Sequence, residues 1–340
     1  MRKIRVLEVE DSAVFRELLV NGLNSDSSIE VVATAVDPYE ARDKIIEYQP
    51  DVMTLDIELP KMNGIDFLRK LIPQYPIPVV VISSLNDKVF DAMQAGAVDF
   101  VAKPVVSEKS ALERFIKREL PVKIKIASTA RISFIKKKNP AKRFVAENKR
   151  ELLIAIGAST GGTEAIASVV KEFGVDIPGV VVVQHMPPGF TQMYAKRLND
   201  QCRVTVKEAV NGDLVLPGQV LIAPGGNCQM RICKSGKNYK IDLRKGPKIN
   251  GHCPSVDVLF ESVASVAQSN AIGILLTGMG ADGARGLLNM RQMGAKTIGQ
   301  DESTCVVYGM PKVAYDIGAV QYQEKLTDIP KRTYNLLNQM

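Results

Sequence analysis

Three side chains with the chemistry of a serine hydrolase stand just after apolar runs in this sequence. Ser159 follows ELLIAIGA, His185 follows GVVVVQ, and Asp282 lies in a glycine-rich stretch after AIGILL. A serine hydroxyl is a poor nucleophile at neutral pH unless a histidine takes its proton and an acid orients that histidine. We therefore expect Ser159 to be the nucleophile, His185 the general base and Asp282 the orienting acid.

The turn that carries Ser159 has two chemical interpretations. Gly157, Ser159 and Gly161 satisfy GxSxG, the pattern of a sharp turn that projects a serine above a sheet. A glycine-rich turn before a helix also suits a pyrophosphate, because backbone N–H groups and the helix dipole favour negative charge there. The turn alone leaves a hydrolase and a dinucleotide-binding enzyme open, and the matching positions of the histidine and the acid favour the hydrolase.

Two further positions belong to the predicted hydrolase site. We expect backbone N–H groups at the start of the helix after Ser159, near Thr160, and at the Met279 turn to stabilise the oxyanion. The second histidine of the chain, His252, lies in a looser segment, and we expect it to be structural, with a contact to the substrate as the alternative.

A second set of reactive residues follows apolar runs in the first third of the chain. Glu10 and Asp11 end the first run, Asp56 ends VMTLD, Ser83 ends VVVIS, and Lys103 ends FVAK. Clustered carboxylates repel one another and normally require a hard cation such as Mg²⁺, for which Glu10, Asp11 and Asp56 are the candidate ligands. Asp56 can then accept a phosphoryl group, whose charge Lys103 neutralises and whose oxygens Ser83 can hydrogen-bond.

The elements that must position these residues are two series of strands and helices. Short β-branched runs alternate with amphipathic stretches in both halves, which predicts an α/β protein with two doubly wound, mostly parallel sheets. The carboxyl ends of parallel strands share one edge, where ligands bind. We expect one domain over residues 1–122, a basic linker over 123–149 and a second domain over 150–340.

Composition restricts the other function classes. The apolar runs are too short to cross a bilayer, which needs about 20 residues, and the amino terminus reads as a strand, so we expect a cytoplasmic protein without membrane insertion. Five scattered cysteines predict neither disulfides nor a zinc site.

Residues 121–150 contain ten Lys or Arg and one Asp or Glu. A transcriptional regulator that binds DNA through this stretch is the remaining alternative, but no helix-turn-helix pattern supports it, and we expect no nucleic acid partner.

Residues 1–120 resemble response-regulator receiver domains. The resemblance rests on the acidic pair, the phosphoacceptor Asp56, the hydroxyl of Ser83 and the Lys103-Pro104 pair in that order. It implies a flavodoxin-like fold, phosphorylation with Mg²⁺, and Phe100 as the aromatic switch residue. The family usually has aspartate where this chain has Glu10.

Residues 150–340 resemble the chemotaxis protein-glutamate methylesterases in GASTGGT, QHMP, GHCPSVDVLF, TGMGADG and YGMPK. The resemblance implies hydrolysis of γ-glutamyl methyl esters and deamidation of specific glutamines, with no cofactor for ester hydrolysis. It implies methylated cytoplasmic helices of chemoreceptors as substrate, a chemotaxis histidine kinase as phosphodonor, and a monomer whose receiver governs access to Ser159. Cys253 stands where the family commonly has arginine.

Overall fold

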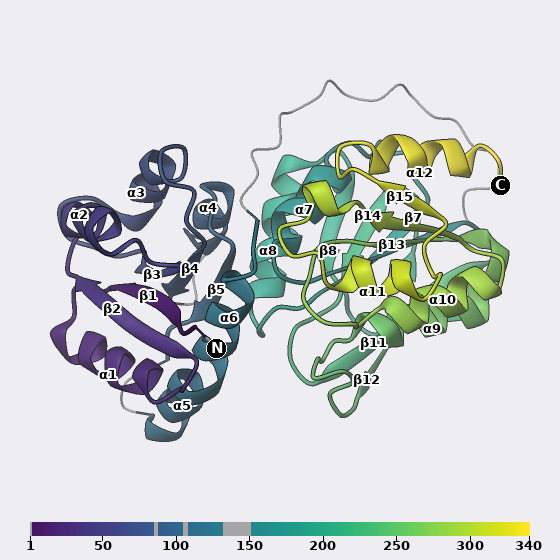
Figure 1. Ribbon diagram of the computed structural model, residues 1–340. Coiled ribbons are helices and arrows are strands. Elements are labelled where there is room, and N and C mark those ends of the chain that lie inside the picture. The colour runs from purple at the N-terminus through teal and green to yellow at the C-terminus, as the bar shows by residue number, and fades with distance from the viewer. Residues whose placement is uncertain (1, 85–87, 105–107, 132–150) are drawn as a thin grey trace. The chain divides into compact units, whose positions relative to one another are not determined.

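Two separate parallel sheets organise the structure, a computed structural model that describes residues 2–84, 88–104, 108–131 and 151–340 (Figure 1). The chain divides into two units, Met1–Ile132 and Ser133–Met340. Each unit has its own sheet with helices on both faces, which confirms the predicted fold class.

The first unit contains a five-stranded parallel sheet in the order β2-β1-β3-β4-β5. Its strands are β1 (Ile4–Val9), β2 (Ile29–Ala35), β3 (Val52–Asp56), β4 (Val79–Ser83) and β5 (Asp99–Ala102). Its helices are α1 (Ala13–Asn24), α2 (Pro38–Tyr48), α3 (Gly64–Leu71), α4 (Lys88–Gln94), α5 (Lys109–Arg114), the π-helical η1 (Phe115–Glu119) and α6 (Leu120–Ala127). Helices α2, α3 and α4 cover one face, and α1, α5 and α6 the other (Figure 1).

The strand order reverses between β1 and β3. Glu10 and Asp11 follow β1, and Asp56 ends β3, so both acidic segments lie beside this reversal. Helix α1 can begin directly after the acidic pair because the Ser12 side chain accepts a hydrogen bond from the Phe15 backbone N–H.

The expected start of the linker at residue 123 is wrong. Helix α6 continues to Ala127, and Leu120, Ile124 and Ala127 are buried in the first unit. Two lysines that we assigned to the linker instead form ion pairs with this unit: Lys123 with Asp99 at 2.7 Å, and Lys125 with Asp26 at 2.6 Å. The rest of the predicted linker, from residue 132 on, lies outside the described residues.

The second unit contains a seven-stranded parallel sheet in the order β15-β14-β13-β6-β7-β10-β8. Its strands are β6 (Leu153–Ala158), β7 (Gly179–Gln184), β8 (Thr205–Glu208), β10 (Gln219–Ile222), β13 (Ala271–Leu275), β14 (Lys296–Gln300) and β15 (Tyr322–Glu324). A smaller antiparallel sheet contains β9 (Leu214–Val215) and the predicted hairpin, β11 (Cys228–Ser235) and β12 (Asn238–Lys245).

Helices cover both faces of the large sheet (Figure 1). One layer contains α7 (Gly162–Val170), α8 (Phe190–Gln201) and α12 (Ile329–Leu337), and the other contains α9 (Val256–Ala267), α10 (Ala284–Gln292), α11 (Met310–Asp316) and the hairpin. The chain leaves β6 toward β7 and later returns to β13 on the other side of β6, so the strand order reverses at β6. Doubly wound sheets place their ligand sites at such a reversal.

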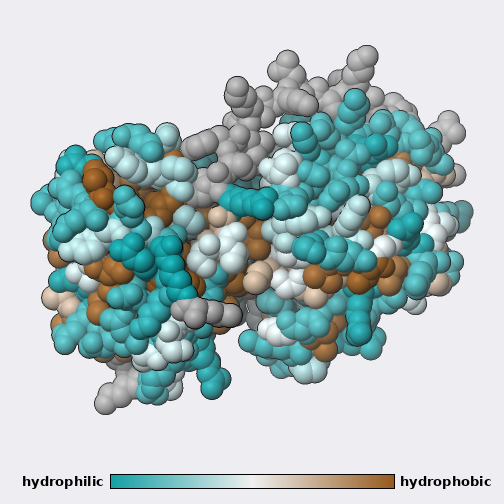
Figure 2. Space-filling model, viewed as in Figure 1, coloured by the Kyte–Doolittle hydropathy of each residue, from teal (hydrophilic) through white to brown (hydrophobic). Residues whose placement is uncertain are grey.

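The visible surface of each unit is mostly hydrophilic, and hydrophobic residues form small separate patches (Figure 2). Over the described part of the chain, every helix is too short or too polar to traverse a lipid bilayer.

Candidate active site

The turn after β6 holds Ser159 at the reversal of the sheet. The Ser159 backbone N–H donates to the Thr277 carbonyl at 3.0 Å, and the Ser159 carbonyl accepts from the Gly162 N–H at 2.7 Å. Gly161 takes the left-handed conformation, with φ 74°, and α7 starts directly after it. Gly161, rather than Ser159, therefore provides the positive φ of this turn, and Ser159 is 9% exposed at its top.

Gly161→Ala should destabilise the second unit by about 2–4 kcal/mol. A side chain at this φ costs about 1–2 kcal/mol, and the new Cβ would lie 2.6 Å from Val306 Cβ, which adds an overpacking cost of about 1–2 kcal/mol. Urea unfolding of the full chain measures the loss. Gly212→Ala is the matched control, because Gly212 has φ +91° but nothing within 4 Å of its would-be Cβ. Equal losses in the two variants would contradict the predicted clash.

His185 and Asp282 form the acid–base pair that the sequence predicts. His185 Nε2 lies 2.8 Å from Asp282 Oδ2, and the histidine side chain is 7% exposed. The pair forms because β7 and β13 flank β6 on either side, so that His185, Ser159 and the loop containing Asp282 all lie at the carboxyl ends of neighbouring strands.

The Asp282 carboxylate sits at the amino terminus of α9. It accepts from the Val256 N–H at 2.8 Å, the Asp257 N–H at 3.2 Å, Ser255 Oγ at 2.7 Å and Asn250 Nδ2 at 3.0 Å. Burial alone would raise the pKa of Asp282, but the hydrogen bond and charge of His185, with the other donors, hold it well below its usual range. Asp282 is therefore ionised at neutral pH.

The ionised acid fixes the proton on His185. A carboxylate only accepts hydrogen bonds, so Nε2 carries the proton and Nδ1 of the neutral ring is the acceptor. Nδ1 is buried and has no hydrogen-bond partner among the described residues. It is the atom available to take a proton from Ser159.

Ser159 lies against the loop that contains Asp282 and is tied to the strand that carries His185. A Cβ built on Gly278 would fall 2.7 Å from Ser159 Cβ, and Gln184 Nε2 donates to the Ser159 carbonyl at 2.8 Å. Within the described residues no hydrogen bond joins Ser159 Oγ to His185. Catalytic hydrogen bonds are often long before substrate binds.

The two predicted oxyanion positions border the same turn. Thr160 is buried, and its carbonyl accepts from Thr277 Oγ1 at 3.0 Å, which orients the peptide between Thr160 and Gly161. Met279 is 43% exposed in the loop between β13 and α10. Their role in binding the oxyanion stays a prediction.

Sequence reasoning missed the residues that support the acid and the base. Asn250, with φ 51°, donates to both Asp257 and Asp282, and Ser255 donates to Asp282. His252, expected to be structural, stacks on His185. The signal for all three was the segment INGHCPS directly before the apolar helix α9, where polar side chains meet a helix start.

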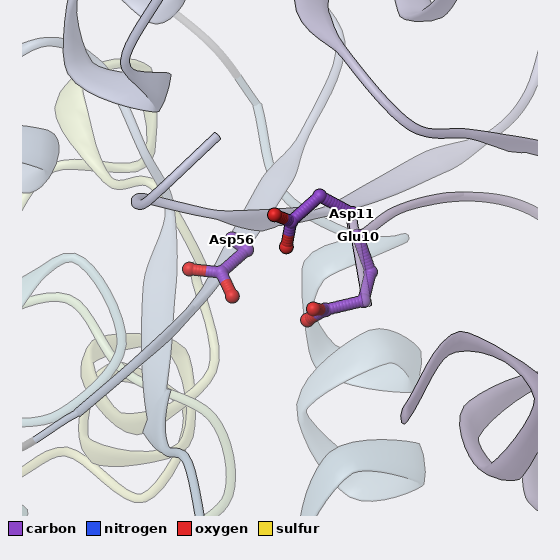
Figure 3. A group of neighbouring side chains, drawn as sticks. All are labelled: Glu10, Asp11 and Asp56. Atoms are coloured by element: carbon purple, nitrogen blue, oxygen red, sulfur yellow. The ribbon is translucent and has the colours of Figure 1, made fainter. Parts of the chain in front are cut away.

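The predicted metal ligands in the first unit do come together. One carboxylate oxygen from each of Glu10, Asp11 and Asp56 lies within 4.8 Å of the others, and the three side chains surround one small space (Figure 3). Hard oxygen donors at this spacing suit Mg²⁺, so the residues fit the ion that the sequence predicts.

Lys103 lies on the same cluster. Its Nζ hydrogen-bonds Asp56 and, at 2.8 Å, Glu10 Oε2. Burial alone would lower the pKa of Lys103, but these two carboxylates raise it. Burial also raises the pKa of Glu10, to about 7, assisted by the charge of Asp56 and opposed by Lys103. The cluster thus pairs the expected phosphoacceptor with a fixed positive charge.

Ser83 and Phe100, the other predicted receiver residues, are both buried. Ser83 Oγ donates to the Ser84 carbonyl at 3.1 Å, and Phe100 packs edge-on against Phe90 with ring centroids 6.2 Å apart. Their switching role stays a prediction.

Glu8 is a buried carboxyl that the sequence predictions left out. It lies inside β1 and hydrogen-bonds Thr54, while its Oε1 has no partner among the described residues. Burial raises the pKa of Glu8 to about 8, and the nearby charges of Glu10 and Asp56 contribute. A glutamate placed between Leu7 and Val9, inside the first apolar run, was the available signal.

Glu8→Gln should remove a pH dependence from the stability of the first unit. Because the folded pKa of about 8 exceeds the ordinary value of 4.5, folding retains a proton, and the resulting stability is lost as the pH rises through 8. Between about pH 6 and pH 9 the wild type should lose about 2–3 kcal/mol relative to Glu8→Gln, because each pH unit below the folded pKa is worth about 1.4 kcal/mol. Hydrogen exchange of the β1 amides in the full chain, with EDTA present, measures this difference. Glu30→Gln, at the exposed position of β2, should behave like wild type. Parallel curves for Glu8→Gln and wild type would refute the prediction.

Comparison with known proteins identifies the family to which the chain belongs. The CheB methylesterase model matches residues 154–333, more than half of the sequence, and the response regulator receiver domain model matches residues 6–115. The chain belongs to the CheB methylesterase family. This confirms the resemblance that the motifs indicate. A CheB methylesterase catalytic domain from Thermotoga maritima has 38% identity and a TM-score of 0.53, and the match covers 54% of this chain and 98% of that one.

Full-length relatives in the CheB methylesterase family share both units. One from Syntrophomonas wolfei, named protein-glutamate methylesterase/protein-glutamine glutaminase 2, is 58% identical over 343 residues, which cover 100% of this chain and 99% of that protein. A protein-glutamate methylesterase/protein-glutamine glutaminase from Salmonella typhimurium is 47% identical, over 98% of this chain and 96% of that one.

Proposed function

We propose that this protein is a phosphorylation-regulated protein-glutamate methylesterase. It hydrolyses γ-glutamyl methyl esters on chemoreceptors, releasing methanol, and deamidates specific receptor glutamines in sensory adaptation. The observation that supports this most directly is the buried His185–Asp282 pair, joined at 2.8 Å next to the Ser159 turn.

The first half of the reaction forms an acyl-enzyme. Ser159 Oγ attacks the ester carbonyl carbon as His185 Nδ1 takes its proton, and Asp282 stabilises the imidazolium through Nε2. Backbone N–H groups near Thr160 and Met279 bind the oxyanion. The tetrahedral intermediate then collapses, and methoxide leaves with the proton from Nδ1 as methanol.

The second half regenerates the enzyme. Water gives a proton to Nδ1 and attacks the acyl carbon, after which Ser159 leaves and recovers that proton. A glutamine side chain follows the same route with ammonia as leaving group. Methanol and ammonia are both small, so specificity must come from the receptor helix around the reacting side chain.

Phosphorylation of Asp56 is the proposed control. A chemotaxis histidine kinase supplies the phosphoryl group, and Glu10, Asp11 and Asp56 would hold Mg²⁺. The ion supplies positive charge that offsets the carboxylates and the incoming phosphoryl oxygens. Lys103 binds the phosphoryl oxygens, and Ser83 and Phe100 convey the change. We further propose a cytoplasmic monomer that binds neither nucleic acid nor the membrane.

A phosphoryl donor should activate the esterase. Acetyl phosphate with Mg²⁺ should raise the initial rate of methanol release about 5- to 100-fold, the usual range for coupling between two sites. The rise should be absent with EDTA, and below about 2-fold in Asp56→Asn. An equal rise in Asp56→Asn and wild type would exclude Asp56 as the site of control.

The test of the proposed function is a direct product assay on receptor membranes. Receptors carrying isotope-labelled methyl esters should release labelled methanol, and unmodified receptors with glutamine at those positions should release ammonia. Receptors with unmethylated glutamate at the same positions are the control. A folded, donor-treated protein that releases neither product would overturn the proposal.

A further inference from the structure

The two histidines of this chain form one stacked pair. The His185 and His252 rings lie 3.6 Å apart between centroids and are inclined by 6°. His252 therefore covers one face of the proposed general base.

The segment that carries His252 is fixed by the fold. The His252 backbone exchanges two hydrogen bonds with Ile249, each 2.9 Å long, and its carbonyl also accepts from Gln229 Nε2 at 3.3 Å. Gln229 is buried on β11, and its Oε1 accepts from the Ser255 N–H at 2.8 Å. The ring is thus anchored to the hairpin and to the start of α9.

Apart from this stacking, the His185 ring is held by a hydrogen bond at one of its ring nitrogens. Asp282 holds the ring at Nε2, but one hydrogen bond at one atom leaves the ring able to tilt about that bond. Nδ1 has no hydrogen-bond partner among the described residues that would stop the tilt. A flat surface parallel to the ring, at van der Waals distance, restricts this motion.

We propose that His252 is a positioning residue for His185. Its ring keeps the base flat, so that Nδ1 stays in position to accept the proton of Ser159 while Nε2 stays on Asp282. This inference rests on the proposed function, because it assigns a role in the same reaction.

Three variants of the full chain test the proposal through methanol release. His252→Ala removes the flat surface and should lower kcat about 10- to 100-fold, with KM changed less than about 2-fold, because a misplaced catalytic group impairs chemistry and not binding. His252→Phe restores a flat aromatic ring and should recover kcat to within about 3-fold of wild type. Ile249→Ala, a truncation at an exposed site in the same segment, should leave kcat unchanged.

Histidine-selective NMR gives a readout independent of turnover. In either His252 variant His185 is the only remaining histidine, so the Nε2–H resonance bonded to Asp282 is unambiguous. It should stay sharp in His252→Phe and broaden by exchange with solvent in His252→Ala.

Each outcome decides the proposal. A kcat equal to that of wild type in His252→Ala overturns the proposal. An equal loss of kcat in His252→Phe and His252→Ala also overturns it, because that result assigns the effect to a ring nitrogen of His252. A sharp Nε2–H resonance in His252→Ala also overturns it. If wild type releases no more methanol than Ser159→Ala, the proposed function fails instead, and the NMR comparison still tests whether His252 holds the ring.

Discussion

Ser159→Ala should lower kcat for methanol release by about 10⁵- to 10⁶-fold, the scale seen when a serine hydrolase loses its nucleophile. Alanine at this position keeps the backbone hydrogen bonds to Thr277 and Gly162 and removes only Oγ, so the turn should survive. Ammonia release should fall by the same factor, because both products come from one acyl-enzyme.

A paired measurement separates lost chemistry from lost structure. Thermal unfolding of Ser159→Ala should match wild type within experimental error, and Ser168→Ala, on the same helix layer, is the control for serine removal. If Ser159→Ala retains more than a hundredth of wild-type kcat, another group is the nucleophile and the proposed mechanism is wrong.

Asp282→Asn should lower kcat about 10⁴-fold, as expected when the acid of a triad becomes an amide. Both oxygens of Asp282 accept hydrogen bonds: His185 and Val256 donate to Oδ2, and Asn250, Ser255 and Asp257 donate to Oδ1. An amide must place its NH₂ on one of these sides. If the NH₂ faces His185, Nε2 must become the acceptor, so the ring proton moves to Nδ1. Nδ1 can then no longer accept the proton of Ser159.

The same substitution should also weaken the fold. Whichever side the NH₂ occupies, it faces buried donors, and an unsatisfied buried donor costs about 1–3 kcal/mol. Urea unfolding and kcat should therefore both change. Asp257→Asn is the matched control: Asp257 accepts from Asn250 and from the Gly286 N–H, both outside the acid–base pair, so its loss in kcat should stay below about 10-fold. Equal losses of kcat in the two variants would contradict the assigned role of Asp282.

The positions of Ser159, His185 and Asp282 were predictable because each depends on local sequence. An apolar β-branched run identifies a buried strand, and residues directly after parallel strands share one edge of the sheet. The same reasoning placed Asp11 and Asp56 together. Each reactive residue ends or directly follows a strand, but contact between them also requires β7 and β13 to flank β6, and the sequence did not predict that strand order.

The supporting residues were not predictable in the same way. The contacts of Asn250, Ser255 and His252 with the acid–base pair depend on how the segment before α9 packs against the hairpin and the β13 loop, which no local pattern specifies. The extent of α6 was a different kind of error. Leu120, Ile124 and Ala127 have helical spacing, but the lysines between them resembled a solvated linker.

The hydrogen bond between His185 and Asp282 joins residues 97 positions apart in the sequence. Such a contact can form only after the intervening strands have been synthesised and β7 and β13 have paired with β6. Contacts between residues far apart in the sequence form slowly. During synthesis Ser159 emerges from the ribosome well before its acid. A partly made or partly folded chain therefore contains a serine without an activated base, so we expect the newly made protein to cleave no esters until this contact has formed.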